Sequence, residues 1–251
     1  MRRIAIIGGA LVGIAAILAA VGLFWFFGGD APEAASVDAA LAQAAASSPS
    51  PVTPASPTVL ASGTAAATAT PGAPVDLAGT YQVVKGDGTF AGYRIKEELR
   101  TIGSNTAVGR SPDVTGSLTF EGKVITAVEV TVSVASLKSD DSRRDNFMQR
   151  NGLQTQQFPT TTFVLSQPIA ISSLPAEGEK AKFEATGDFT LHGVTRRVTI
   201  PLEGARQAGT VVVAGSLEVV LADYKIQKPV ASTVLSINDK GLMEFQITFR
   251  K

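Results

Sequence analysis

The feature that most constrains the fold is a strict alternation of apolar and polar residues in the part of the chain that follows Gly79. The clearest run covers residues 182–192, where small or apolar side chains alternate with charged and hydroxyl-bearing ones. A period of two places one set of side chains on a buried face of a β-strand and the other set on a wet face. The inward set is Phe183, Ala185, Gly187, Phe189 and Leu191.

The same period recurs in further runs, each bounded by Gly, Pro, Asn or Asp residues that favour turns. These runs include residues 128–134, 198–202, 217–221 and 243–249. Strands of about ten residues, with no helices alternating between them, predict an antiparallel barrel or sandwich, and their length favours a tall barrel. One interruption is predicted to be helical, from Ser142 to Arg150, after the candidate capping residues Ser139, Asp140 and Asp141.

The interior of such a barrel is either filled by side chains or open to a ligand. Ala185 and Gly187 are small residues at mid-strand on the inward face, which favours an opening. A glycine at this position equally fits a bend or bulge at a barrel corner, so both interpretations remain open.

A carboxylate also falls on an inward face. Glu97 has the phase of Tyr93, Ile95 and Leu99, whereas Arg94, Lys96, Glu98 and Arg100 face the other way. A buried carboxylate is costly unless it is paired or hydrated. Glu97 is therefore a candidate ligand contact, and a position at the rim of the barrel is the simpler alternative.

The N-terminal segment is predicted to be a membrane anchor. An uncharged apolar run extends from Ile4 to Phe27, and as a helix it would measure roughly 36 Å, enough to cross a bilayer. Arg2 and Arg3 precede the run, and no Lys or Arg follows it until Lys85. The positive-inside rule then predicts a single-pass cell-membrane protein with a cytoplasmic N-terminus and an extracytoplasmic C-terminal domain. A cleaved signal peptide is the competing interpretation.

Residues 28–78 are predicted to be a disordered linker between the anchor (1–27) and the β domain (79–251). The segment consists largely of Ala, Pro, Ser and Thr and has few large apolar side chains to offset the entropy of ordering. Its prolines favour an extended spacer. A short helix over residues 34–46 is compatible with the composition but not required by it.

Three segments resemble one known family. They are VSVASL at 132–137 followed by Arg144-Asp145, FPTTTF at 158–163, and GDFTLHGVTR at 187–196. In their order and spacing they resemble the YceI-like family of lipid- or polyisoprenoid-binding proteins, over roughly residues 79–251. Two positions depart from that family's pattern: Tyr81 replaces its usual opening Trp, and Glu97 stands where a His is common.

The resemblance implies an all-β, lipocalin-like fold, an extended eight-stranded antiparallel barrel with an elongated apolar tunnel. It also implies an extracytoplasmic location and, as ligand, an isoprenoid or another amphiphilic lipid. We expect the inward residues to contact that ligand, and Arg196, in phase with Val198 and Ile200 at a strand start, to meet its head group. The predicted ligand contacts are Tyr93, Ile95, Glu97, Leu99, Phe163, Leu165, Phe183, Phe189 and Arg196.

No constellation for catalysis emerges from the sequence. His192 is the only histidine, it lies at a predicted hairpin turn, and there is no cysteine. The sequence therefore does not provide the residues expected of a Ser-His-Asp triad or of a zinc site. Arg143, Arg144 and Asp145 are interpreted as surface ion pairs and a loop cap. Because 22 basic residues balance 22 acidic ones, nucleic-acid binding lacks its electrostatic basis.

The sequence thus predicts a binding protein without a cofactor rather than an enzyme. The leading hypothesis is a carrier that holds a lipid in an apolar barrel cavity. The alternative is a structural or protein-interaction module whose barrel is filled.

Overall fold

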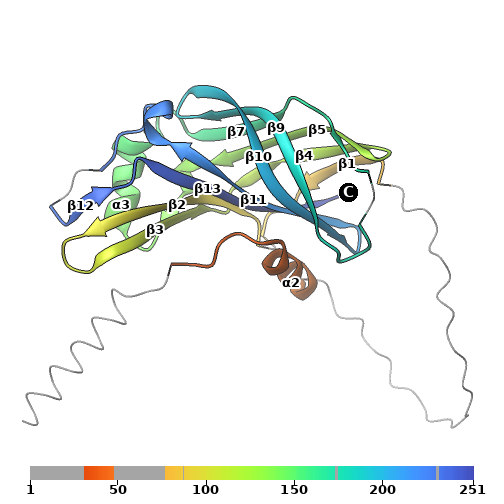
Figure 1. Ribbon diagram of the computed structural model, residues 1–251, viewed down its shortest axis with the longest axis horizontal. Coiled ribbons are helices and arrows are strands. Elements are labelled where there is room, and N and C mark those ends of the chain that lie inside the picture. Colours follow the sequence, from red (N-terminus) through yellow and green to blue (C-terminus); the bar gives the residue numbers. More distant parts are fainter. Residues whose placement is uncertain (1–30, 48–76, 87, 173–174, 230–231) are drawn as a thin grey trace, which may run out of the picture.

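The alternating runs of the sequence form the strands of one antiparallel sheet, which closes into a barrel in the computed structural model (Figure 1). The structure describes residues 31–47, 77–86, 88–172, 175–229 and 232–251. The predicted anchor at 4–27 and most of the predicted linker lie outside these ranges. Within them, no helix is both long enough and apolar enough to span a bilayer.

Eight strands make the closed ring. In spatial order they are β1 (Gly79–Val83), β4 (Val114–Glu121), β5 (Val124–Ser133), β7 (Thr160–Leu165), β9 (Ala181–Leu191), β10 (Val194–Gln207), β11 (Thr210–Val220) and β13 (Lys240–Arg250). The ring closes because β1 pairs with β4 on one side and with the end of β13 on the other. The eight-stranded antiparallel barrel that the family resemblance implied is confirmed.

A hairpin lengthens one wall of this barrel. It consists of β2 (Phe90–Leu99) and β3 (Gly103–Ser111), and β2 pairs with the first half of β13, next to the part that pairs with β1. Three short strands complete the sheet: β6 (Lys138–Ser139) pairs with β3, β8 (Ile169–Ala170) with β5, and β12 (Val234–Ile237) with β2. The barrel is therefore drawn out along the hairpin (Figure 1).

The inward phase predicted for β9 is the buried one, and its glycine has a specific neighbour. The pairing of β9 with β10 runs without a shift from Leu191↔Val194 to Ala181↔Gly204, so Gly187 marks no bulge in this ladder. A Cβ on Gly187 would lie 2.5 Å from Cζ of Phe163. The glycine therefore makes room for the Phe163 ring, which packs over it from the neighbouring strand.

The predicted helix is present as α3 (Ser142–Phe147), which continues into a π-helical turn, η2 (Met148–Gly152). Asp141 is its N-cap and accepts a 2.8 Å hydrogen bond from the backbone N of Arg143. Two 3-10 turns, η1 (Val134–Ser136) and η3 (Leu221–Tyr224), precede and follow it in the chain. Apolar residues of η1, η2 and η3 and their flanks pack around Phe189, so these elements close one end of the interior.

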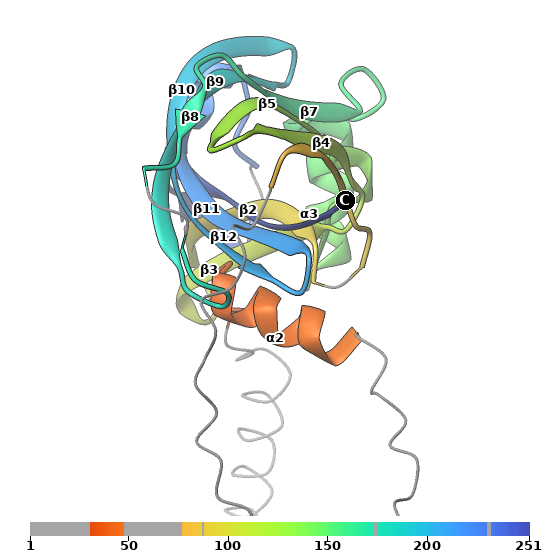
Figure 2. The same cartoon turned by 90° about the vertical axis from the view of Figure 1, so that its right-hand side faces the viewer.

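One element differs from the extended linker that we expected over residues 28–78. Helix α2 (Val37–Ser47) lies against the outside of the barrel, over β10, β11 and β13 (Figure 2). Val37 is 1% exposed and packs on Ala205 and Ala214, whose small outward side chains leave a flat apolar surface for the helix. This burial explains why the segment is ordered despite its linker-like composition.

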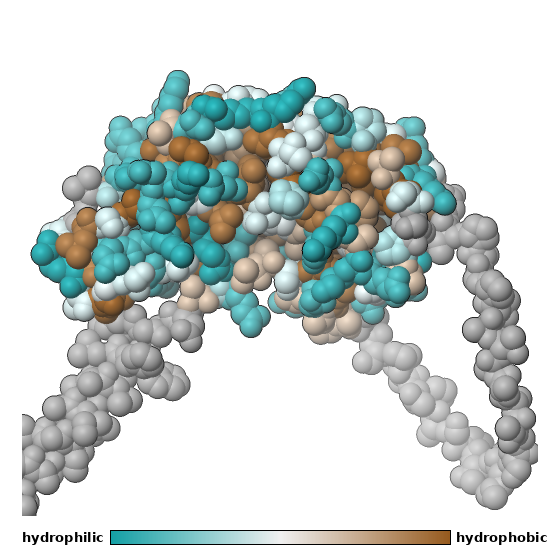
Figure 3. All heavy atoms as spheres, in the orientation of Figure 1, coloured by the Kyte–Doolittle hydropathy of each residue, from teal (hydrophilic) through white to brown (hydrophobic). Residues whose placement is uncertain are grey.

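The chain that leads into α2 also covers a polar surface of the barrel. Glu244, on the outward face of β13, is 3% exposed and binds both Arg94 (3.3 Å) and Arg110 (2.8 Å). The backbone N of Ala35 donates to Glu244, and the two arginines donate to the carbonyls of residues 32 and 33. On the face that Figure 3 shows, hydrophilic residues are interspersed with small groups of hydrophobic ones.

Candidate functional site

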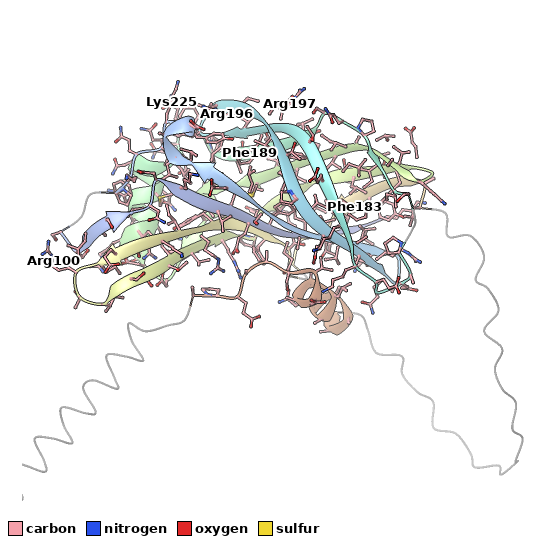
Figure 4. All side chains as sticks on the ribbon, in the orientation of Figure 1. Arg100, Phe183, Phe189, Arg196, Arg197 and Lys225 are labelled. Carbon is pink, nitrogen blue, oxygen red and sulfur yellow. The ribbon has the colours of Figure 1, made fainter. Side chains whose placement is uncertain are left out.

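The barrel encloses an elongated cavity of about 270 Å³. Its wall consists almost entirely of inward-facing apolar side chains from both ends of the barrel, and it includes the small residues Ala91, Ala107 and Ala185, which leave the space open. On β9 the wall extends from Phe183 to Leu191, which corresponds to roughly 26 Å of strand. Figure 4 shows Phe183 and Phe189 at well-separated points along this strand.

Six of the nine predicted ligand contacts line this cavity. They are Tyr93, Ile95, Glu97, Phe163, Phe183 and Phe189. The other three do not belong to its wall as far as the structure describes the chain. Leu165 packs into the core beside the cavity instead, and Leu99 pairs with Gly103 and Val234 near the end of the hairpin.

Arg196, the predicted head-group contact, is the third of these, and it lies outside the cavity wall among the described residues. Its side chain is 47% exposed, and its Nη2 lies 3.2 Å from Oδ1 of Asp223. Its guanidinium also lies 5.8 Å from the ring centroid of Tyr224. The first residues of β10 run beside η3, so the inward phase at this strand start meets η3 rather than the cavity (Figure 4).

Glu97 is buried and paired rather than solvated at a rim. Its side chain is 4% exposed, and its Oε1 accepts hydrogen bonds of 2.8 Å from Nη2 of Arg144 and from Nδ2 of Asn105. Arg144 binds Asp140 as well. Burial lowers the pKa of Arg144, but the carboxylates of Glu97 and Asp140 outweigh it and hold this pKa above its ordinary value. Both members of the pair line the cavity.

The helix that supplies Arg144 is fixed to the barrel by its neighbours. Asp145 accepts hydrogen bonds from the backbone N (2.9 Å) and Oγ (2.7 Å) of Ser139, and Arg143 pairs with Asp141 on the surface. The predicted loop cap and surface ion pair are therefore confirmed. The inward role of Arg144 was missed, although an inward carboxylate at Glu97 was a signal that a cation had to reach it.

Tyr93 places a hydroxyl at the same end of the barrel. This hydroxyl is buried and has no hydrogen-bond partner among the residues that the structure describes. Ser139 lies close by, but its proton goes to Asp145 while its oxygen accepts from the backbone N of Asp141 and from Arg144. Burial raises the pKa of Tyr93 to about 12, so the hydroxyl stays protonated at neutral pH.

Arg206 is the remaining charged residue of the wall, and it lies near the opposite end. It is half-buried, and its Nε donates to the carbonyl of Pro175 at 3.1 Å. Within the described ranges, no carboxylate lies within 4.0 Å of its guanidinium nitrogens. Sequence reasoning missed Arg206, although the inward phase of Val198, Ile200 and Leu202 continues through Gly204 to this residue.

His192 lies at the hairpin turn predicted for it, where its ring holds neighbouring segments together. It occupies the β9–β10 turn with φ +50° and is 9% exposed. Its Nδ1 lies 2.9 Å from the carbonyl of Tyr224, and its Nε2 lies 3.1 Å from Oε1 of Gln154. In the part of the chain that the structure describes, no group of three or more His, Asp or Glu residues is placed to hold a metal ion.

The fold and the cavity define a closed antiparallel β-barrel with an apolar interior that is open enough for a ligand. Comparison with known families matches the YceI-like domain over residues 81–249. The chain belongs to the YceI-like family.

Two curated relatives are similar in sequence. Protein YceI of Escherichia coli O157:H7 is 30% identical over 128 residues, which cover 49% of this chain and 61% of that protein. A UPF0312 protein of Photorhabdus laumondii is 30% identical over 131 residues, covering 51% of this chain and 62% of the relative. The chain spans about three fifths of the length of these relatives.

One solved structure is similar in fold. It is a polyisoprenoid binding domain from Saccharophagus degradans that is implicated in plant cell wall breakdown. It superimposes with a TM-score of 0.52 at 15% sequence identity, covering 68% of this chain and 97% of that one. At this identity the likeness establishes a shared fold.

Proposed function

We propose that this protein binds an amphiphilic lipid, such as an isoprenoid, in the cavity of its barrel, and that it is a binding protein rather than an enzyme. The observation that carries the proposal is the long cavity walled by apolar side chains. Each 100 Å² of lipid tail buried there contributes about 2.5 kcal/mol before the cost of association. The similar fold of a polyisoprenoid binding domain supports the same ligand class. A filled barrel that acts only through its surface is the alternative, and an open interior disfavours it.

The test is native mass spectrometry of the protein purified from its own host. We expect a co-purified lipid in the wild type and its loss in Ala185→Phe, because Ala185 is 4% exposed and faces the cavity. The matched control is Ala127→Phe, which adds the same ring to an exposed residue of β5 and should leave the lipid in place. Absence of lipid from repeated wild-type preparations, or its full retention in a folded Ala185→Phe variant, would contradict the proposal.

We further propose that residues 4–27 hold this barrel at a membrane, with the N-terminus in the cytoplasm and the barrel on the other side. The segment that leads into α2 is bound to the outside of the barrel, and this limits how far the barrel can lie from the membrane. Arg94 already binds the carbonyl of Pro32, and the chain from Phe27 to Pro32 spans at most roughly 18 Å when fully extended. Residues 48–76 would then connect α2 to β1 and would not set the distance from the membrane.

The location can be tested by cysteine labelling, because the natural chain has no cysteine. Lys123→Cys places a thiol in the exposed β4–β5 turn. We expect a membrane-impermeant maleimide to label it in intact cells, and deletion of residues 1–30 to release the protein from the membrane fraction. Labelling that requires cell lysis would contradict the proposed orientation, and release of the full chain by high salt would contradict the anchor.

A further inference from the structure

Two arginines occupy opposite ends of the same face of β10. Arg196 and Arg206 share the inward phase of this strand and are separated by roughly 33 Å of extended chain. Arg196 is ion-paired with Asp223 and lies outside the cavity wall, whereas Arg206 lines the cavity. The same residue type in the same phase therefore meets two different surroundings.

The charges of the cavity wall do not balance. Its charged residues are Glu97, Arg144 and Arg206, and the first two bind each other at the α3 end. Arg206 is left as the uncompensated charge in the described part of the wall. A cation beside an apolar cavity is stabilised when an anion meets it there, since a charge in low dielectric needs a partner.

Two acidic residues that follow Pro175 in the chain are engaged with the backbone. Glu177 accepts a hydrogen bond from the backbone N of Ala208, and Glu179 accepts one from the backbone N of Ala176 at 3.2 Å. Neither carboxylate forms an ion pair with Arg206 within the described residues. The guanidinium uses its Nε on Pro175, so its two terminal NH₂ groups remain available for an oxygen-bearing group.

We propose that Arg206 binds the anionic head group, a phosphate or carboxylate, of the lipid whose tail occupies the cavity. This inference rests on the function proposed above. The aliphatic stem of Arg206 contributes to the apolar wall, while its planar guanidinium matches the geometry of such oxygens. Arg206 lies at the end of the barrel where Pro175 follows β8, called here the β8 end, and the tail then runs from this end toward Phe189. Among the described residues of the cavity wall, the opposite end offers no equivalent anion site, because Arg144 already donates to Glu97, Asp140 and Ser139.

The experiment compares two ligands with the same tail, farnesyl phosphate and farnesol. Native mass spectrometry of the delipidated full-length protein, in one non-ionic detergent throughout, gives both affinities for each variant. We expect the wild type to bind farnesyl phosphate about tenfold more tightly, the effect of one hydrogen-bonded charge contact. Arg206→Gln should reduce this ratio to near one without weakening farnesol, and Arg206→Lys should keep part of it. The matched control, Arg196→Gln, should keep all of it.

The outcomes separate the two proposals. If neither compound binds the wild type, the isoprenoid function and the head-group site both fail. If both bind it equally, or if a folded Arg206→Gln variant keeps the preference, the head-group site is overturned while the cavity function stands. Inorganic phosphate should not displace farnesyl phosphate; complete displacement would overturn the assignment to a lipid head group.

Discussion

The two ends of the cavity differ in whether their charged side chains are paired. At the α3 end, the buried Glu97 and the largely buried Arg144 bind each other at 2.8 Å. Glu97 also accepts a hydrogen bond from Asn105, and Arg144 also binds Asp140. At the β8 end, Arg206 contributes a guanidinium with only the carbonyl of Pro175 as partner in the described part of the chain. The first arrangement is self-sufficient and the second is incomplete.

This difference in pairing leads to different predictions for mutations at the two ends. A buried ion pair whose members satisfy each other needs nothing from a ligand, and removing one member leaves a charge stranded in low dielectric. Removal of a cation that has no carboxylate partner strands no buried charge in the protein. The comparison therefore predicts large stability effects at the α3 end and binding effects at the β8 end.

The largest stability effect is expected for Arg144→Met, which leaves Glu97 buried without its cation. We expect a loss of about 3 kcal/mol in the free energy of unfolding, measured by urea denaturation. The control is Arg143→Met, whose side chain is 83% exposed and whose replacement should lower the free energy of unfolding far less than that of Arg144. Addition of Glu97→Leu to Arg144→Met should recover most of the loss. Equal effects of the two single arginine variants would mean that Asn105 alone satisfies Glu97.

The next effect concerns the hydroxyl of Tyr93 beside that pair. Its pKa is about 12 in the folded protein and 10 in the unfolded chain. Between these values the unfolded chain releases its proton first, so stability is complete below pH 10 and falls as the pH rises toward 12. By pH 11.5 the loss from this group should be about 2 kcal/mol. It should be absent from Tyr93→Phe.

The two proteins are compared by urea denaturation at pH 9 and pH 11.5, so that every other titrating group is common to both. At neutral pH, Tyr93→Phe should be at least as stable as the wild type, because it removes a buried hydroxyl that has no partner among the described residues. A clear loss of stability at pH 7 would show that the hydroxyl has a partner in solution.

Part of the cavity wall was visible in the sequence, because period-two alternation is a local property. It correctly placed Tyr93, Glu97, Phe183 and Phe189 on the inner face. The partner of Glu97 was not visible, since Arg144 is 47 residues away and reaches it only through the packing of α3. The cavity and the order of the strands likewise needed either the fold or the family resemblance.

The outer surface was harder to predict for the same reason. Glu244, Gln246 and Thr248 have the polar phase of a solvent-facing strand, yet they are almost completely buried. The segment that covers Glu244 and Gln246 is about 200 residues earlier in the chain and has a linker-like composition. Arg206 was overlooked because Gly204 interrupts the apolar run while the phase continues.

A smaller effect is expected where α2 covers the outside of the wall next to Arg206. Val37→Asp places a carboxylate against Ala205 and Ala214, and should cost about 1.5 kcal/mol by undocking the helix. Limited proteolysis within α2 should accelerate in step with this loss. Ala42→Asp, on the exposed side of the same helix, should change neither quantity appreciably. Unchanged cleavage in Val37→Asp would contradict the docking of α2 in solution.

The smallest effect sharpens the comparison most. Arg206→Gln removes a charge that has no carboxylate partner in the described ranges, so the free energy of unfolding of the ligand-free protein should change by less than about 0.5 kcal/mol. The reference is Arg144→Met, measured in the same urea titration of delipidated protein. A loss near that of Arg144→Met would mean that Arg206 has a structural partner, and the two ends of the cavity would then be alike. A stable variant that has lost its preference for the phosphate ligand would separate them, because the charge of Arg206 would then contribute to binding and not to the stability of the fold.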